Sequence, residues 1–118
     1  MNINWEVEYY STTNGKMPAK EFIENLPLKL RAKVFRDIVL LEEFGIELKE
    51  PHSKHLKEGI YELRVRIGKD QSRILYFFFC NQKIIMTNGF IKKTQKTPPG
   101  EIERALKYKA DHERRFLK

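Results

Sequence analysis

Cysteine is almost absent from this sequence, since Cys80 is the only one among 118 residues. An intramolecular disulfide and a cysteine-rich metal site are therefore excluded, which suits a reducing cytosol. Long apolar runs are absent too: the longest covers residues 74–80, whereas a membrane-spanning helix needs about 20 residues. The N-terminal segment lacks the pattern of a signal peptide. We therefore expect a soluble, cytoplasmic protein that has no membrane partner.

Metal ligands are also sparse. Residues 71–100 contain no carboxylate, and His, Asp and Glu nowhere recur at the spacing of a metal site. A metal-dependent nuclease is therefore poorly supported, and the sequence predicts neither a metal site nor a cofactor.

Basic residues are abundant and unevenly placed. The formal net charge is +7, from 23 Lys and Arg against 16 Asp and Glu. Residues 1–48 carry a net charge of −2, while segments 49–73, 74–91 and 92–118 carry +3, +1 and +5. A basic C-terminal two-thirds on a small domain is typical of a protein that binds nucleic acid. The alternative is a solvated basic surface that only maintains solubility.

Hydrophobic periodicity in the N-terminal part predicts one strand and two helices. Residues 3–10 alternate between apolar and polar side chains, with Ile3 on the apolar face, as in a half-buried strand. Pro18 suits the first turn of a short helix that Pro27 ends. A second helix runs from Leu28 to a stop at Gly45. Its apolar positions are Val34, Phe35, Ile38, Leu41 and Phe44.

The remainder predicts three consecutive strands and a last helix. Residues 46–59 are expected to be irregular; residues 61–67 alternate, placing Glu62, Arg64 and Arg66 on one polar face. After a turn at 68–71, residues 72–80 are apolar on both faces, as in a central strand, and residues 83–91 form the next strand. Thr97 is the expected N-cap of the last helix. The predicted order in one domain, 1–118, is β-α-α-β-β-β-α, an α+β fold with an antiparallel twisted sheet.

Three sequence blocks resemble the RelE/ParE toxin superfamily. Residues 54–64 read KHLKEGIYELR and match its K-x-L-x-x-G-[IL]-[YW]-E-L-R signature. Arg73 stands where the family has an R-[IVL]-x-[YF] element. Residues 89–98, GFIKKTQKTP, are similar to the run found in the HigB and phage Gp49-like branch, and residues 101–105 match the helix start E-I-x-x-A.

This resemblance implies a RelE-like fold whose helices pack on one face of the sheet. The other face would be a concave basic groove that accepts mRNA in the ribosomal A site. The implied function is that of a type II toxin: a metal-independent mRNA endoribonuclease on translating ribosomes. Its implied partners are mRNA, the ribosome and a cognate antitoxin, a helix-turn-helix protein of the HigA type. Two alternatives remain open: a toxin that acts only by binding, as a DNA gyrase inhibitor, and a non-catalytic nucleic-acid-binding module.

Metal-independent RNA cleavage needs a base for the ribose 2′-OH, an acid for the departing 5′ oxygen, and cations for the charge of the transition state. Arg64 and Arg73 are the candidates for phosphate and transition-state binding, because a guanidinium donates two parallel hydrogen bonds and stays charged. Lys54 and His55 are the candidates for proton transfer. We expect both arginines on the open face of the sheet.

Further residues are candidates for holding RNA: Lys57, Arg66, Phe90, Lys92 and Lys93. The lysines would steer phosphate and Phe90 would stack on a base, a role that Tyr61 could also fill unless the ring belongs to the core. Arg64 or Arg66 could instead only pair with Glu62. Several nucleases of this superfamily have a catalytic Tyr or His near the end of the last strand or the C-terminus. This sequence has no direct counterpart of that residue, because the only late candidates, Tyr108 and His112, fall inside the predicted last helix.

Overall fold

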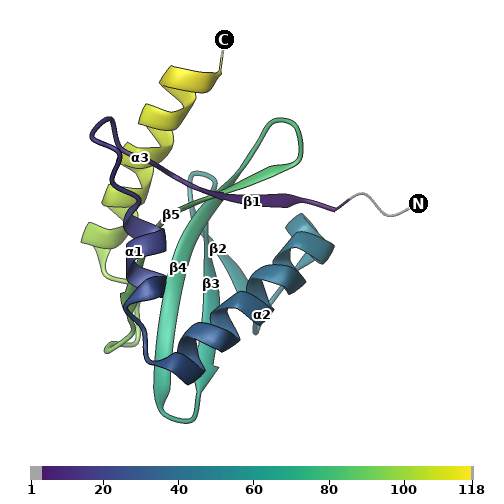
Figure 1. Cartoon of the computed structure of the whole chain (residues 1–118), viewed down its shortest axis with the longest axis vertical. Coiled ribbons are helices and arrows are strands. Elements are labelled where there is room, and N and C mark those ends of the chain that lie inside the picture. The colour runs from purple at the N-terminus through teal and green to yellow at the C-terminus, as the bar shows by residue number, and fades with distance from the viewer. Residues whose placement is uncertain (1–3, 118) are drawn as a thin grey trace.

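Five strands form one sheet in the computed structural model, which describes residues 4–117 (Figure 1). The elements are β1 (Glu6–Tyr9), α1 (Pro18–Glu24), α2 (Leu28–Phe44), a 3-10 turn η1 (Gly45–Glu47), β2 (Ser53–Lys57), β3 (Ile60–Ile67), β4 (Asp70–Phe79), β5 (Lys83–Ile91) and α3 (Pro99–Phe116). Strand order is β1-β5-β4-β3-β2. The α+β class and the antiparallel meander are thereby confirmed. Ile3 lies outside the described residues.

Two features of the sheet differ from the sequence prediction. Residues 53–57, expected to be irregular, form the edge strand β2, which pairs antiparallel with β3. The alternation of apolar and polar residues in β2 is weak, because the strand is short and carries exposed lysines. Charged side chains of this kind often protect an edge strand from pairing with another chain. In addition, β1 pairs parallel with β5. A hairpin would have imposed the antiparallel direction, but β1 and β5 are far apart in the chain.

Helices α1 and α2 cover one face of the sheet. Their buried residues pack on alternate positions of β3, β4 and β5. In α2 the buried stripe consists of Leu30, Val34, Ile38 and Leu41, together with Asp37. Phe35 and Phe44, counted with the apolar face from sequence, are 46% and 45% exposed. Phe35 follows Val34 directly and therefore points about 100° away from the buried stripe.

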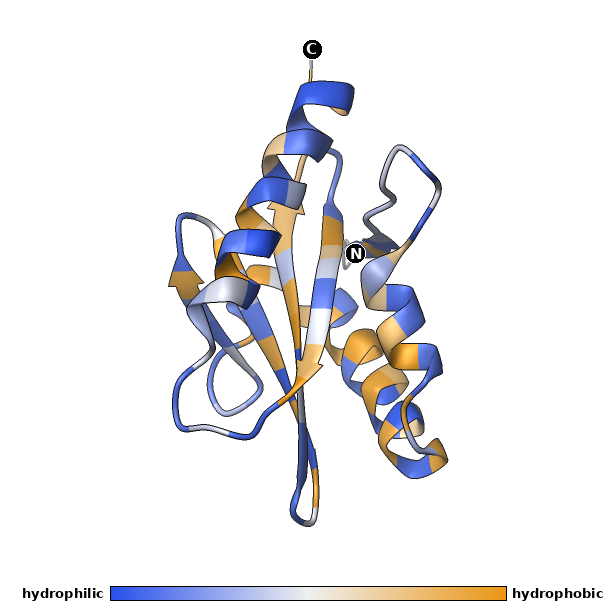
Figure 2. Ribbon diagram, turned by 90° about the vertical axis from the view of Figure 1, so that its left-hand side faces the viewer, coloured by the Kyte–Doolittle hydropathy of each residue, from blue (hydrophilic) through white to orange (hydrophobic). Residues whose placement is uncertain are grey.

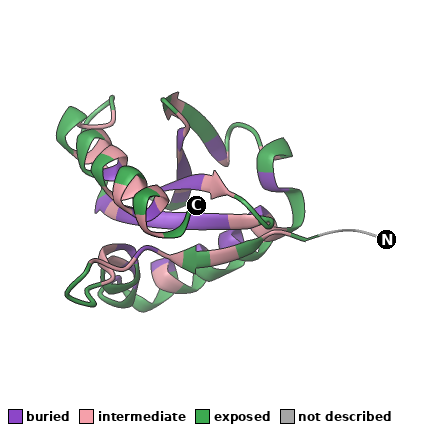
Figure 3. Ribbon diagram, turned by 90° about the horizontal axis from the view of Figure 1, so that it is seen from above, coloured by how far each residue is buried: buried purple, intermediate pink, exposed green. Residues whose placement is uncertain are grey.

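The opposite face is covered by α3, contrary to the expectation that all helices share one face. Ala105 of α3 belongs to a second buried cluster with Leu75, Phe77 and Ile85. Figures 2 and 3 show α3 on one side of the sheet and α1 and α2 on the other. Strand β4 is apolar on both faces, as predicted, because helices cover both.

Local signals placed most element boundaries correctly. Pro18 begins α1, and Gly45, with a φ of 54°, follows the last residue of α2. Asn81 and Gln82 both have positive φ and belong to the three-residue turn, residues 80–82, between the paired residues Phe79 and Lys83. The turn predicted at 68–71 is shorter, because Asp70 already pairs with Ile67. None of the helices within residues 4–117 is long and apolar enough to cross a bilayer.

Candidate nucleic-acid interface

A buried carboxylate lies at the centre of the polar face of β3. Glu62 is 1% exposed. One of its oxygens lies 3.0 Å from Nε of Arg64, and the other lies 3.7 Å from Nε of Arg73. The hydroxyl of Thr97 donates a hydrogen bond of 2.6 Å to the same carboxylate. Thr97 therefore does not cap α3, whose N-cap is Pro98.

The register of the sheet brings the two arginines together. Arg64 of β3 is the direct cross-strand partner of Arg73 of β4. Like charges directly opposite one another destabilise a sheet. Glu62 lies two residues before Arg64, on the same face, and so supplies the opposite charge between them. The alternative that Arg64 pairs with Glu62 is thus observed, and this ion pair fixes where the guanidinium lies.

Arg73 is buried, which contradicts its expected place on an open face. It is 5% exposed, and its guanidinium donates to the carbonyl of Ser72 at 3.2 Å and to Oε1 of Gln71 at 3.1 Å. Burial lowers the pKa of Arg73; Glu62 opposes this shift, and Arg64 adds to it. Arg64 is more accessible, with 26% of its side chain exposed and Nη1 at 3.3 Å from Glu50.

A polar groove of about 640 Å³ opens above these arginines. Its basic lining consists of Arg64, Arg66, Arg73, Lys92 and Lys93. The segment after β5 forms one wall: the backbone N–H of Lys92 donates to Gln71, and its ammonium donates to the carbonyl of Gln95 at 2.8 Å. Burial lowers the pKa of Lys92, and the charge of Arg73 adds to this effect. Five cations around one buried carboxylate favour an anionic ligand.

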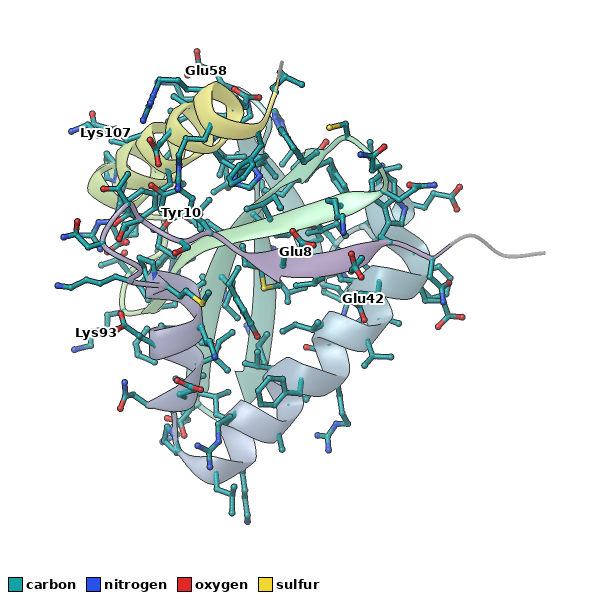
Figure 4. All side chains as sticks on the ribbon, turned by 45° about the horizontal axis from the view of Figure 1, so that its top comes forward. Glu8, Tyr10, Glu42, Glu58, Lys93 and Lys107 are labelled. Carbon is teal, nitrogen blue, oxygen red and sulfur yellow. The ribbon has the colours of Figure 1, made fainter. Side chains whose placement is uncertain are left out.

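A neighbouring hollow extends this groove toward β2. Arg64 and Lys92 border both hollows, and the second adds Lys54 and Lys96. We call the combined surface the cationic groove and define it by Lys54, Arg64, Arg66, Arg73, Lys92 and Lys93. All six were candidates from sequence, whereas Lys96, which also borders the second hollow, was not. Figure 4 shows Lys93 at the periphery of the molecule and Lys107 on α3. Both are exposed, and Lys107 lines neither hollow of the groove.

Phe90 and Lys57 do not line the groove, and His55 only borders the hollow beside Lys54. The ring of His55 packs edge-on against Tyr61, at 4.9 Å between centroids, and its Nε2 accepts a hydrogen bond from the backbone N–H of Gly59. Phe90 is only 9% exposed and lies in the core beneath α3. The prediction that its ring stacks on a base is therefore wrong. Lys57 is exposed beyond a register shift between β2 and β3.

Other site residues escaped the sequence prediction. From sequence Glu62 is expected only as an ion-pair partner of Arg64 or Arg66, although its i, i+2 spacing from Arg64 already places the two on one face. No sequence feature predicted that Gln71 and Gln95 would line the groove. The late candidates Tyr108 and His112 lie in α3, as predicted. Tyr108 stacks on Tyr10, and His112 packs against Phe77, Phe79 and Phe116.

The family of this chain follows from a family model described as phage-derived protein Gp49-like (DUF891), which matches residues 21–110. The match includes β2 to β5 and all six residues of the cationic groove. The chain belongs to the Gp49-like family. This family is part of the RelE/ParE-like toxin superfamily and indicates a toxin-like protein of a toxin–antitoxin pair, with an antitoxin as partner. A search of curated proteins finds no match.

Among residues 4–117 no three His, Cys, Asp or Glu side chains are grouped so that they could hold a metal ion.

Proposed function

We propose that this Gp49-like protein is the toxin of a type II toxin–antitoxin pair and cleaves mRNA on translating ribosomes without a metal ion. The observation that carries the proposal is the cationic groove. There Arg64 and Arg73 share one buried carboxylate, while Lys54 and Lys92 border the same opening. A helix-turn-helix antitoxin of the HigA type is the proposed partner that neutralises it.

The groove offers the chemistry that RNA cleavage requires. The 2′-OH attacks the adjacent phosphorus, losing its proton to a base, and the bond from phosphorus to the 5′ oxygen breaks as an acid protonates that oxygen. The pentacoordinate intermediate carries additional negative charge, which fixed cations stabilise. We assign this role to Arg64, the more accessible arginine, whose direction Glu62 sets. Arg73 supports it from below as a positioning residue.

Proton transfer is assigned to lysines of the groove. Lys54 was a candidate from sequence and borders the hollow beside Arg64. Lys92 joins it, because burial and the neighbouring Arg73 lower its pKa and so favour the neutral amine that a base requires. His55 is less suited to this role, since its Nε2 already accepts the hydrogen bond from Gly59.

Mapping mRNA 5′ ends in cells tests the activity. Induction of the chain without an antitoxin should arrest growth and produce new 5′ ends within translated frames. Arg64→Ala should abolish both effects and lower the single-turnover rate on programmed ribosomes by about two to three decades, or about 3–4 kcal/mol. Lys107→Ala removes an exposed charge outside the groove and serves as the matched control.

Two results would contradict the proposal. Intact mRNA together with double-strand DNA breaks would indicate a gyrase poison. Intact mRNA and intact DNA, with Arg64-dependent binding to nucleic acid, would indicate a non-catalytic binding module.

A further inference from the structure

A separate hollow, which is not part of the cationic groove, lies beside the edge strand β2. It has a volume of about 380 Å³ and opens between η1, the segment after it and β2. Its lining is mixed: Ile46 and Leu48 are apolar, His55 and Tyr61 supply rings, and Lys49, Glu50 and Lys54 supply charge. The volume falls within the range of small-ligand sites. Of the residues that line this hollow, the proposed catalytic chemistry uses only Lys54.

The two rings form a fixed corner in this hollow. Their planes meet at 62°, with centroids 4.9 Å apart. Tyr61 is held from behind by Tyr76, on which it stacks at 5.6 Å, and by the edge of Phe78. His55 is held by the hydrogen bond of 3.2 Å from Gly59. The ring of His55 is exposed and already oriented, so a flat ligand can stack on it at little cost in side-chain entropy.

The hollow is continuous with the cationic groove. Lys54 and His55 both border this hollow and the cationic groove, and their side chains leave β2 on opposite faces of the sheet. Lys54 is paired with Glu62 on the groove side, while His55 is paired with Tyr61 on the other side. Glu50, in the lining of the hollow, also lies 3.3 Å from Arg64. An RNA strand that crosses β2 from the cationic groove would therefore contact the phosphate-binding cations first and the rings of His55 and Tyr61 next.

We propose that this hollow binds one unstacked nucleobase of the mRNA whose phosphates lie in the cationic groove. The inference rests on the proposed function and adds a base-binding subsite to it. Single-stranded RNA is typically held in this way, with splayed bases on aromatic or histidine rings beside a basic track. His55 thus acts as a base-stacking residue, a different role from the proton transfer predicted from sequence.

The test is a cycle of protein and RNA changes on programmed ribosomes. Single-turnover cleavage at subsaturating toxin is compared between an intact mRNA and mRNAs that carry one abasic ribose at successive positions around the cleavage site. One position should slow the wild-type protein about tenfold, the effect expected for one lost stacking contact. His55→Ala should slow cleavage of the intact mRNA by a similar factor. It should show no further loss on the abasic mRNA, because the same contact is already missing.

Two variants complete the design. Ile46→Ser changes the apolar lining at a residue that is 52% exposed, and should reproduce the effect of His55→Ala without unfolding the protein. Phe35→Ala removes an exposed ring on α2, away from the hollow, and should behave as the wild-type protein does at every position.

The outcomes separate the two proposals. If cleavage proceeds and no abasic position slows it, or if the losses from His55→Ala and the abasic ribose simply multiply, the base-binding subsite is wrong while the proposed nuclease stands. If the wild-type protein cleaves neither mRNA, the proposed function is wrong and the subsite falls with it.

Discussion

Neutralising Glu62 should destabilise the fold far more than neutralising any exposed carboxylate. Glu62→Gln keeps the shape of the side chain but removes the only negative charge beside the buried guanidinium of Arg73, 3.7 Å away, within the described residues. At an effective dielectric constant of 20, an attraction at this distance is worth about 4 kcal/mol. Removing one partner of a buried ion pair typically costs about 3–5 kcal/mol, because the other charge stays buried without compensation.

Urea unfolding at neutral pH measures this loss. We expect Glu62→Gln to lower the free energy of unfolding by about 3–5 kcal/mol. Glu50→Gln is the matched control, because Glu50 also pairs with Arg64 but has 61% of its side chain exposed. Its loss should stay within about 0.5 kcal/mol, since water screens the pair. Arg73→Met added to Glu62→Gln should recover part of the loss, because the unpaired buried charge is then gone.

Equal losses from Glu62→Gln and Glu50→Gln would refute this reasoning. They would mean that solvent screens Glu62 despite its burial. Strictly additive losses in the Glu62 and Arg73 double variant would show that the two side chains are not energetically coupled.

Three further predictions concern packing, pH and charge. Gly89→Ala should lose about 1–3 kcal/mol of stability in urea, because the new Cβ would lie 2.3 Å from the ring of Phe22; Gly100→Ala, with open space around its Cβ, should lose none of it. Burial lowers the pKa of His112 below its ordinary 6.5, so the unfolded chain binds the proton first and the free energy of unfolding should fall as pH drops from about 6.5. His112→Phe should abolish this pH dependence in urea unfolding curves, and an unchanged pH dependence would refute the assignment to His112. Lys93→Ala should reduce the salt dependence of ribosome binding by about one unit of log–log slope, and an effect no larger than that of Lys107→Ala would remove Lys93 from the interface.

Local sequence patterns predicted the strands, helices and turns whose formation depends on residues near one another in the chain. The alternation of residues 61–67 identified β3, and the double apolar character of residues 72–80 identified β4 as central. Pro18, Gly45 and the turn at Asn81 mark real boundaries because each reports the backbone conformation of its own position. The six basic residues of the groove could also be predicted from the sequence, because the blocks that resemble the family contain Lys54, Arg64, Arg73, Lys92 and Lys93, and i, i+2 spacing adds Arg66.

Which side chains meet in the candidate site could not be predicted from local sequence patterns. Burial of Glu62 depends on Arg73 and Thr97, which reach it only through the register of β4 and the path of the chain after β5. The positions of His55 and Phe90 depend on which face of the sheet each strand residue takes and on what covers that face. The period of a strand shows that alternate side chains share a face, but it does not show which face a later helix will cover. Only the tertiary structure decided that α3 buries Phe90, and that His55 turns toward Tyr61 while Lys54 turns toward the arginines.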